Sequence, residues 1–224
     1  MLLQLLGGIA LPAGELARAA RVTPQTASAH LARMVEGGLL IHESLGRHRY
    51  YRLASPEVGQ ALETLSAIAQ PQPVRSLRES DQLRTLRFAR MCYDHIAGEV
   101  GVVLADRLRT LDLLNEVGRD FVVTAEGAAW LGDFGMDLDR IRRGRRHFAR
   151  QCLDWSERRH HVAGALGAAM ADRMFELRWM ERIAGGRAVR VTVEGYRGLE
   201  RMLGISFAGK TVVLDGSADG GLRT

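Results

Sequence analysis

The stretch Ala13–Leu53, AGELARAARVTPQTASAHLARMVEGGLLIHESLGRHRYYRL, predicts the fold of the N-terminal third. In its middle, Thr23 offers the side-chain oxygen of a helix N-cap, and Pro24 follows at the first helical position, where a missing N–H costs nothing. Gly37-Gly38 ends that helix by supplying a left-handed residue. One face of the helix is apolar, through Ala27, Leu31, Met34 and Val35.

A shorter helix over 14–20 precedes this one, and Arg21-Val22 forms the turn between them. Two strands follow, over 40–44 and 49–53, with Gly46 permitting a tight turn. Helix, turn, helix and hairpin in this order are typical of a winged helix-turn-helix, whose second helix enters the major groove of DNA.

The predicted DNA contacts lie on the polar face of the second helix and at the basic tip of the hairpin. From these positions side chains reach base edges and phosphates. The net charge of +5 fits a polyanionic partner. A solvated hairpin with three basic residues is the alternative for the tip. The predicted DNA-binding residues are Thr23, Gln25, Thr26, Ser28, His30, Arg33, Arg47, His48 and Arg49.

The segments GELARAA, VTPQTASAHLARMVEGGLL and GRHRYYRL resemble the ArsR/SmtB family of bacterial winged-helix repressors, over about residues 1–69. The resemblance implies a homodimeric repressor that an inducer releases from a double-stranded DNA operator. Many members bind soft metals through cysteines at the start of the recognition helix. Here positions 19–23 hold no cysteine, so that metal site is absent.

A further helix begins at Ser55-Pro56-Glu57, with an apolar stripe. The resemblance implies that this helix builds the dimer interface; packing against its own chain is the alternative. The stripe consists of Val58, Ala61, Leu62, Leu65 and Ala69.

Gln70-Pro71-Gln72-Pro73 breaks this helix, and helix is expected to resume near the cap Ser80-Asp81 and to run beyond Met91. We therefore expect a winged helix-turn-helix DNA-binding and dimerisation domain over 1–70 and a linker over 71–80. A regulatory domain follows over 81–214. The tail 215–224 has too little apolar content to order itself.

The regulatory domain contains a duplication. FARMCYD at 88–94 matches FARQCLD at 148–154 at five of seven positions, and 95–107 matches 161–173 at seven of thirteen. TAEG at 124–127 then matches TVEG at 192–195. The offset rises from 60 to 66 to 68, so the second copy carries an insertion after Asp154. Three blocks in the same order indicate two repeats, over about 81–140 and 141–214.

Each repeat is predicted to place FARxCxD on a helix and HxAGxxGxxxADR on a second helix of small residues. A hairpin follows (117–123; 184–191), and then a helix capped by Thr124 or Thr192. The fold class is therefore mostly α with small β-hairpins (α+β): a winged helix-turn-helix plus two pseudo-symmetric helix–hairpin–helix repeats. The basic run 140–147 between the copies is either a solvated face or a surface for phosphate or the other subunit.

The repeated Cys-x-Asp blocks are the predicted effector site. Three hypotheses assign it a ligand or a reaction, and a fourth makes the repeated residues plain core and capping groups. The predicted effector residues are Cys92, Tyr93, Asp94, His95, Cys152, Asp154, Trp155, Arg158, His160 and His161.

In the first hypothesis an organic inducer stacks on Tyr93, Trp130, Trp155 and Trp179 while His95, His161 and Arg158 orient it. In the second, a soft metal ion binds to Cys92, His95, Cys152 and His161. In the third, Cys92 and Cys152 act as a thiol switch. Only the second hypothesis involves a cofactor, the metal ion; the others require none.

Other function classes are disfavoured. The chain carries no nucleophile elbow, phosphate loop, HExxH or dinucleotide fingerprint, so we do not expect an enzyme. No apolar run is long enough to span a membrane, and we expect a cytoplasmic protein. The predicted function is an inducer-released homodimeric DNA-binding repressor. The rival from another class is an architectural protein that coats DNA without an inducer.

Overall fold

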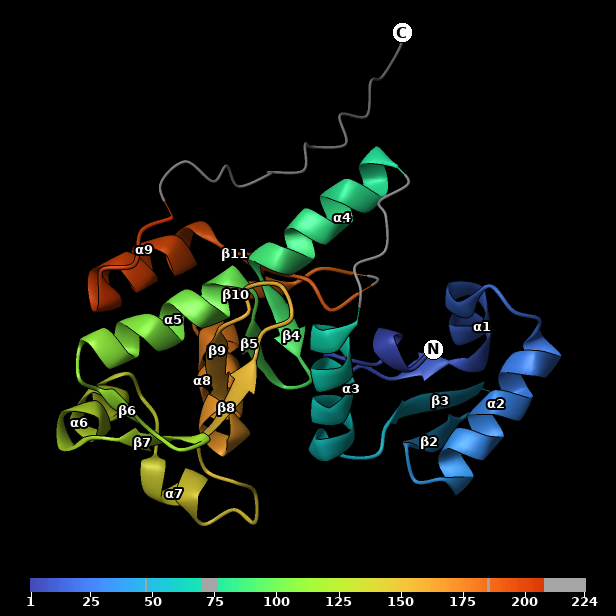
Figure 1. Cartoon of the computed structure of the whole chain (residues 1–224), viewed down its shortest axis with the longest axis horizontal. Coiled ribbons are helices and arrows are strands. Elements are labelled where there is room, and N and C mark those ends of the chain that lie inside the picture. The colour runs from blue at the N-terminus through green and yellow to red at the C-terminus, as the bar shows by residue number, and fades with distance from the viewer. Residues whose placement is uncertain (47, 70–75, 185, 208–224) are drawn as a thin grey trace, which may run out of the picture.

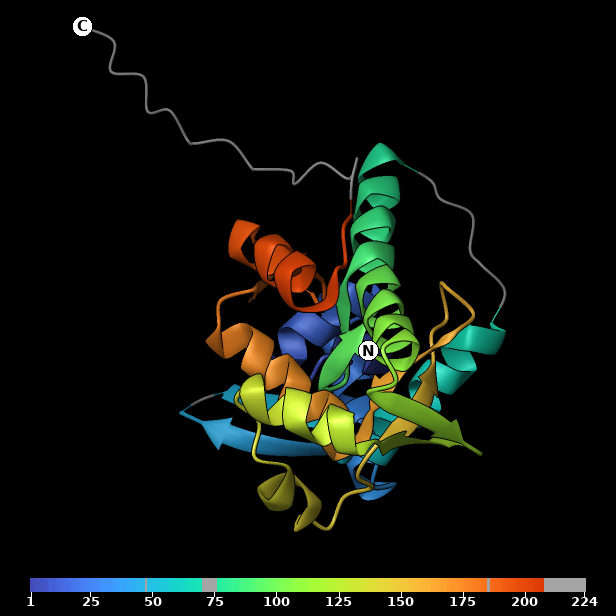
Figure 2. The same ribbon diagram turned by 90° about the vertical axis from the view of Figure 1, so that its left-hand side faces the viewer.

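The computed structural model describes residues 1–46, 48–69, 76–184 and 186–207. It has two parts, a winged helix-turn-helix and a larger C-terminal part, with helix α3 between them (Figure 1). Turned by 90°, the C-terminal part faces the viewer and the winged helix-turn-helix lies behind it (Figure 2). The predicted mixture of helices and small antiparallel sheets is confirmed. None of the helices in the described ranges is long and apolar enough to cross a membrane.

The winged helix-turn-helix forms as its capping residues predict. The Thr26 N–H donates to the Thr23 side-chain oxygen over 3.2 Å, and Gly37 is the C-cap of the same helix. Leu16, Leu31 and Leu53 are fully buried in the core that the helices share with the hairpin. The elements are a 3-10 turn η1 (Leu2–Gln4), β1 (Leu11–Pro12), α1 (Ala13–Ala20), α2 (Pro24–Glu36), β2 (Leu40–Leu45) and β3 (His48–Leu53), in sheet order β1-β3-β2.

Helix α3 (Pro56–Ile68) has three faces with different surroundings. Val58 and Leu62 pack against the core of the winged helix-turn-helix. A second face, Gly59, Glu63 and Ala67, is buried, and its contacts are with the C-terminal part. The third face is exposed. The predicted stripe is thus divided: Val58 and Leu62 point inward, whereas Ala61 and Leu65 are exposed.

Helix α4 (Leu77–Phe88) begins earlier than predicted, because Ser76, not Ser80, is its N-cap and accepts a hydrogen bond from the Glu79 N–H over 3.1 Å. The predicted linker 71–80 is therefore too long at its C-terminal end. Its residues 71–75 and the predicted tail 215–224 lie outside the described ranges. The helix also ends at Phe88 instead of passing Met91.

The prediction of a helix over each FARxCxD block is wrong. Cys92 pairs with His95 and Cys152 with His161 in two short antiparallel hairpins. A short apolar run fits a buried strand as well as a buried helix, and the pairing partner decides between them. Copy one is β4 (Arg90–Cys92), β5 (His95–Ala97), α5 (Glu99–Thr110), β6 (Leu114–Val117), β7 (Asp120–Val123) and α6 (Ala125–Asp133).

Copy two repeats this order after the short helix α7 (Leu138–Arg142). A hairpin follows the small-residue helix of each copy as predicted, but it begins earlier than predicted, at Leu114 and at Met180. The caps Thr124 and Thr192 are confirmed, and each threonine accepts a hydrogen bond over 2.9 Å from a glycine N–H three residues on. The elements are β8 (Arg150–Leu153), β9 (His160–Ala163), α8 (Gly164–Glu176), β10 (Met180–Arg182), β11 (Val189–Val191) and α9 (Val193–Leu203).

The two copies interlock. The second hairpin of copy one joins the first hairpin of copy two in a sheet of order β6-β7-β8-β9. In the reciprocal position, Arg90 of β4 forms a bridge with Ala188 beside β11. Equivalent glycines let the two halves approach closely: a Cβ on Gly101 would lie 3.5 Å from the His161 Cβ, and one on Gly167 would lie 3.2 Å from the His95 Cβ. This symmetry places the two first hairpins face to face.

Candidate functional site

The exposed face of α2 carries the predicted DNA contacts. Ala27 and Leu31 fix the helix to the core. The Thr23 and Thr26 hydroxyls lie 2.9 Å apart, so Thr23 serves the cap as well as the surface. His48 and Arg49 are exposed on β3, and Arg47 lies outside the described residues. The exposed predicted residues of the helix and its cap are Thr23, Gln25, Thr26, Ser28, His30 and Arg33.

The exposed side chains have the chemistry of DNA contacts. Amide and imidazole groups on an exposed helix can pair with base edges, and basic groups on the adjacent hairpin can meet phosphates. The described predicted contacts on α2 and β3 are thus accessible to a partner.

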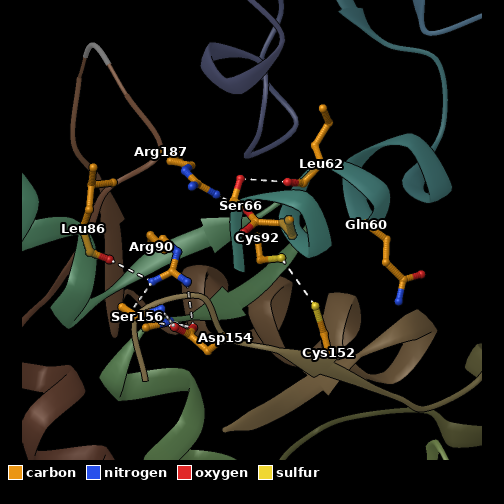
Figure 3. A network of polar contacts seen from close by, with 12 residues as sticks. Gln60, Leu62, Ser66, Leu86, Arg90, Cys92, Cys152, Asp154, Ser156 and Arg187 are labelled. Carbon is orange, nitrogen blue, oxygen red and sulfur yellow. Dashed lines mark hydrogen bonds and ion pairs between the residues drawn. The ribbon is translucent and has the colours of Figure 1, made fainter. Parts of the chain in front are cut away.

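The C-terminal part contains a second site, in which the repeats bring two thiols and two imidazoles together. The ligand atoms of Cys92, His95, Cys152 and His161 all lie within 4.8 Å of one another. The two sulfurs are 3.8 Å apart and the two Nε2 atoms 3.2 Å apart. Each pair has one member from each copy, and Figure 3 shows the sulfurs pointing toward one another. All four side chains are buried.

Each imidazole also has a carboxylate beside its other nitrogen. His95 Nδ1 lies 3.2 Å from Asp94 Oδ1, and His161 Nδ1 lies 3.5 Å from Asp154 Oδ2. The second contact lacks the geometry of a hydrogen bond, and His161 Nδ1 is otherwise without a partner among the described residues. The Asp94 carboxylate beside His95 Nδ1 favours the proton on that nitrogen, so that His95 Nε2 faces His161 Nε2.

The surroundings of Cys92 and His161 disfavour their charged forms, whereas those of His95 favour its charged form. The hydrogen bond to Cys152 and burial raise the pKa of the Cys92 thiol well above its usual range. Burial and the neighbouring His95 lower the pKa of His161 well below its usual range. Burial also opposes the charging of His95, but Cys92, where it is ionised, and the hydrogen bond with Asp94 raise its pKa to about 9. The cluster can therefore hold negative sulfur only next to a cation.

Asp154 organises the back of the cluster (Figure 3). It forms a fully buried ion pair with Arg90 at 2.8 Å and accepts the Gly98 N–H at 2.6 Å. Burial raises its pKa, but Arg90 outweighs that effect and lowers the pKa far below the usual range. The Arg90 guanidinium also stacks over Trp155 at 4.6 Å. Asp154 and Trp155 thus have a structural role: through their contacts with Arg90 they hold the hairpins in place.

The remaining predicted effector residues divide between the interface and the surface. Tyr93, with φ of 59°, packs beneath Gly59 of α3. Arg158 donates to the Ala67 carbonyl oxygen at the end of α3. His160 is exposed. The first two therefore connect the hairpins to the winged helix-turn-helix.

The aromatic residues of the predicted organic pocket do not converge. Trp130 and Trp179 both pack against Phe134 in the C-terminal core, and Trp155 stacks on Arg90. A pocket does lie beside the cluster, between α3 and the hairpins. Among its described lining residues, Tyr93 is the only tyrosine, and there is no tryptophan or phenylalanine. The lining residues are Pro56, Glu57, Gln60, Cys92, Tyr93, Asp94, His95, Arg146, His147, Arg150, Ala163 and Gly164.

Sequence reasoning missed Arg90 and the contacts of α3 with the repeats. Arg150 Nη1 donates to Gln60 Oε1 over 3.2 Å, and Arg187 pairs with the buried Glu63. The available signal was that the FARxCxD blocks share an arginine, Arg90 and Arg150, as well as a cysteine. Glu63 and Arg187 carried no such signal.

Comparison with known proteins agrees with the first site. Residues 1–43 match the model of a helix-turn-helix domain family. The uncharacterized HTH-type transcriptional regulator YdfF of Bacillus subtilis (strain 168) is 47% identical over 205 residues, which cover 92% of this chain and 91% of that protein. No solved structure matches the chain. The likeness to YdfF runs through both the winged helix-turn-helix and the repeats, and the chain belongs to the HTH-type transcriptional regulators.

Proposed function

We propose that this regulator is a homodimeric repressor of the ArsR/SmtB type, which binds an operator through α2 and releases it in response to an effector sensed by the repeats. The observation that carries the proposal is the capped helix α2, whose exposed polar face lies beside a basic hairpin. Two such helices in a dimer reach successive major grooves about 34–36 Å apart.

The exposed face of α3 supports the dimer. Leu65 and Ile68 are 58% and 74% exposed, and Ala61 is on the same face one turn earlier. Such a stripe on a helix that also touches the DNA-binding core suits a two-fold interface between copies of this chain.

The contacts of α3 with the repeats support the control of DNA binding. Arg150, Arg158 and Arg187 of copy two each bond to α3, at Gln60, Ala67 and Glu63. Because α3 also packs on the core that holds α2, a change in the hairpins can change the position of the recognition helices in a dimer.

The experiment is a selection of binding sites from random duplex DNA, followed by affinity measurements on the selected operator and a scrambled sequence. We expect a palindromic site. Gln25→Ala or His30→Ala should each reduce discrimination between the two sequences by about 1–3 kcal/mol. Arg49→Ala should weaken binding to both sequences alike and reduce the salt slope by about 1. Arg201→Ala, an exposed charge on α9, is the control.

A selection that returns no preferred site, together with a steep salt slope, would instead support a DNA-coating protein. Binding that the three variants of α2 and β3 all leave unchanged would contradict the assignment of these elements as the DNA interface.

A further inference from the structure

We propose that Cys92, His95, Cys152 and His161 bind a single thiophilic d10 cation, for which zinc(II) is the best geometric match, and that this ion is the effector of the regulator. Binding of the ion stands on the cluster alone, whereas its role as effector rests on the proposed function.

The ligand set is the first argument. Two thiolates and two imidazoles form the Cys2His2 donor set of closed, four-coordinate zinc sites. Hard cations such as magnesium and calcium prefer oxygen donors, so this set selects against them. The four side chains are at most 7% exposed, which leaves no open position for water and disfavours a catalytic metal.

The distances are the second argument. A tetrahedral zinc ion with Zn–S of about 2.3 Å and Zn–N of about 2.0–2.1 Å separates its two sulfurs by about 3.8 Å and its two nitrogens by about 3.3–3.4 Å. The described sulfurs are 3.8 Å apart and the Nε2 atoms 3.2 Å apart. The two sulfurs and the two nitrogens are therefore each spaced as in a tetrahedral site, and all four donors lie within 4.8 Å of one another.

The surroundings of the imidazoles are the third argument. With Asp94 and Asp154 beside the Nδ1 atoms, the Nε2 atoms of His95 and His161 face each other across 3.2 Å. Without a metal ion, a proton shared between the two Nε2 atoms joins them in a hydrogen bond, and a cation that displaces this proton can bind both lone pairs. Carboxylate, imidazole and metal in this order recur in protein zinc sites, where the carboxylate fixes the tautomer of the ligand.

The pocket beside the cluster supplies an entry path. Its lining includes the ligands Cys92 and His95, the carboxylates of Glu57 and Asp94, and Gln60 of α3. The charged groups of the lining are balanced, Glu57 and Asp94 against Arg146 and Arg150, and α3 forms one wall of the pocket. The site is therefore reached from the same side on which the repeats touch the DNA-binding part.

The ligands are adjacent in sequence to residues that contact α3. Tyr93, between Cys92 and Asp94, packs on Gly59, and Arg150, two residues before Cys152, bonds to Gln60. One ion with ligands from both copies fixes the β4–β5 and β8–β9 hairpins relative to one another. It thereby fixes the surface on which α3 rests, and this is the differential contact that coupling between two sites requires.

The first experiment measures metal binding by the full chain, without an affinity tag, stripped by a chelator and kept reduced. We expect one cobalt(II) per chain, with the thiolate charge-transfer and ligand-field bands of a tetrahedral ion, and its displacement by zinc(II). Cys92→Ala, Cys152→Ala and His161→Gln should each abolish these bands. His160→Gln, which changes the exposed neighbouring histidine, should leave them intact.

Circular dichroism shows whether each variant folds. If a variant does not fold, thermal denaturation of the wild-type protein replaces it. We expect zinc(II) to raise the wild-type thermal midpoint and magnesium(II) to leave it unchanged. A folded wild-type chain that binds neither cobalt nor zinc overturns the proposal. Formation of a Cys92–Cys152 disulfide by a chain that never binds these ions favours the thiol switch instead.

The second experiment tests whether the ion controls the affinity for DNA. The affinity for the selected operator should change at least ten-fold between the zinc-loaded and stripped protein, and by reciprocity the operator should change the zinc affinity by the same factor. If zinc binds at one per chain but leaves operator affinity unchanged, the ion is not the effector although the site stands. If no operator is bound in either state, the proposed function fails while metal binding is judged by the first experiment.

Discussion

At the scale of single residues, the ion pair of Arg90 and Asp154 is costly to desolvate, because both groups are fully buried. Removing one partner of such a pair leaves an uncompensated buried charge. We expect Arg90→Met to reduce the free energy of unfolding by about 3–5 kcal/mol, measured by urea denaturation. Arg84→Met removes an exposed pair with Asp81 and should cost well under about 1 kcal/mol.

The free energy of unfolding lost in Arg90→Met should depend on pH. Arg90 lowers the pKa of Asp154, so this carboxylate contributes stability above the pKa of an unfolded aspartate, about 3.9, and loses it as the pH falls through the lower folded pKa. In the variant, protonation relieves the unpaired charge. The difference between wild type and variant should therefore narrow in acid. A difference that stays constant from pH 7 to pH 4 would assign it to lost packing on Trp155.

Asp94 should tune the proposed metal site without binding the ion. It lies 3.2 Å from His95 Nδ1 and also pairs with Arg146 at 2.6 Å. Asp94→Asn keeps the shape but loses the charge that orients and polarises the imidazole, so zinc affinity should fall about 10–100-fold. Competition with a chromogenic chelator measures this change. The exposed Asp81→Asn is the matched control, and equal affinities for the two variants would remove Asp94 from the site.

At the scale of elements, substitutions of two glycines in α6 distinguish the effect of close packing from that of helix propensity. A Cβ on Gly127 would lie 2.0 Å from the Leu113 carbonyl oxygen, whereas Gly132 in the same helix has open space. We expect Gly127→Ala to be destabilising because backbone must shift, and Gly132→Ala to stabilise by up to about 1 kcal/mol. Thermal denaturation of both variants tests the pair. Similar effects of the same sign would mean that Gly127 is not in close contact with the β6–β7 hairpin.

An element could be predicted from the sequence where the residues that determine it lie within the element itself. The Thr23 cap, Pro24 and Gly37 lie within the segment that they delimit, so α2 could be placed from the sequence. The FARxCxD blocks form strands because His95 pairs with Cys92 across the short turn 93–94, His161 pairs with Cys152 across the longer loop 154–159, and the other copy covers both hairpins. Blocks as short as these carry no periodic signal that distinguishes such a strand from a helix.

At the scale of the whole molecule, the duplication predicted which residues are equivalent but not where they meet. The sequence therefore provided the four candidate ligands, whereas their spacing depends on the exchange of hairpins between the copies. The contacts of α3 were inaccessible for the same reason, since Glu63 and Arg187 are far apart in the sequence and have no counterparts in the motifs. Long-range pairing is thus the information that a single sequence did not supply.

The assembly can be tested through the exposed stripe of α3. In the proposed dimer, Leu65 and Ile68 lose their exposure to water, so a charge at either position would be buried without a partner. We expect Leu65→Glu and Ile68→Glu to shift the chain from dimer to monomer in sedimentation equilibrium. Operator affinity should fall with it, because two half-sites are then bound independently. Val117→Glu, on β6 with 59% exposure, is the control and should stay dimeric. Monomeric wild type at micromolar concentration, or dimeric α3 variants, would place the dimer interface elsewhere or remove it.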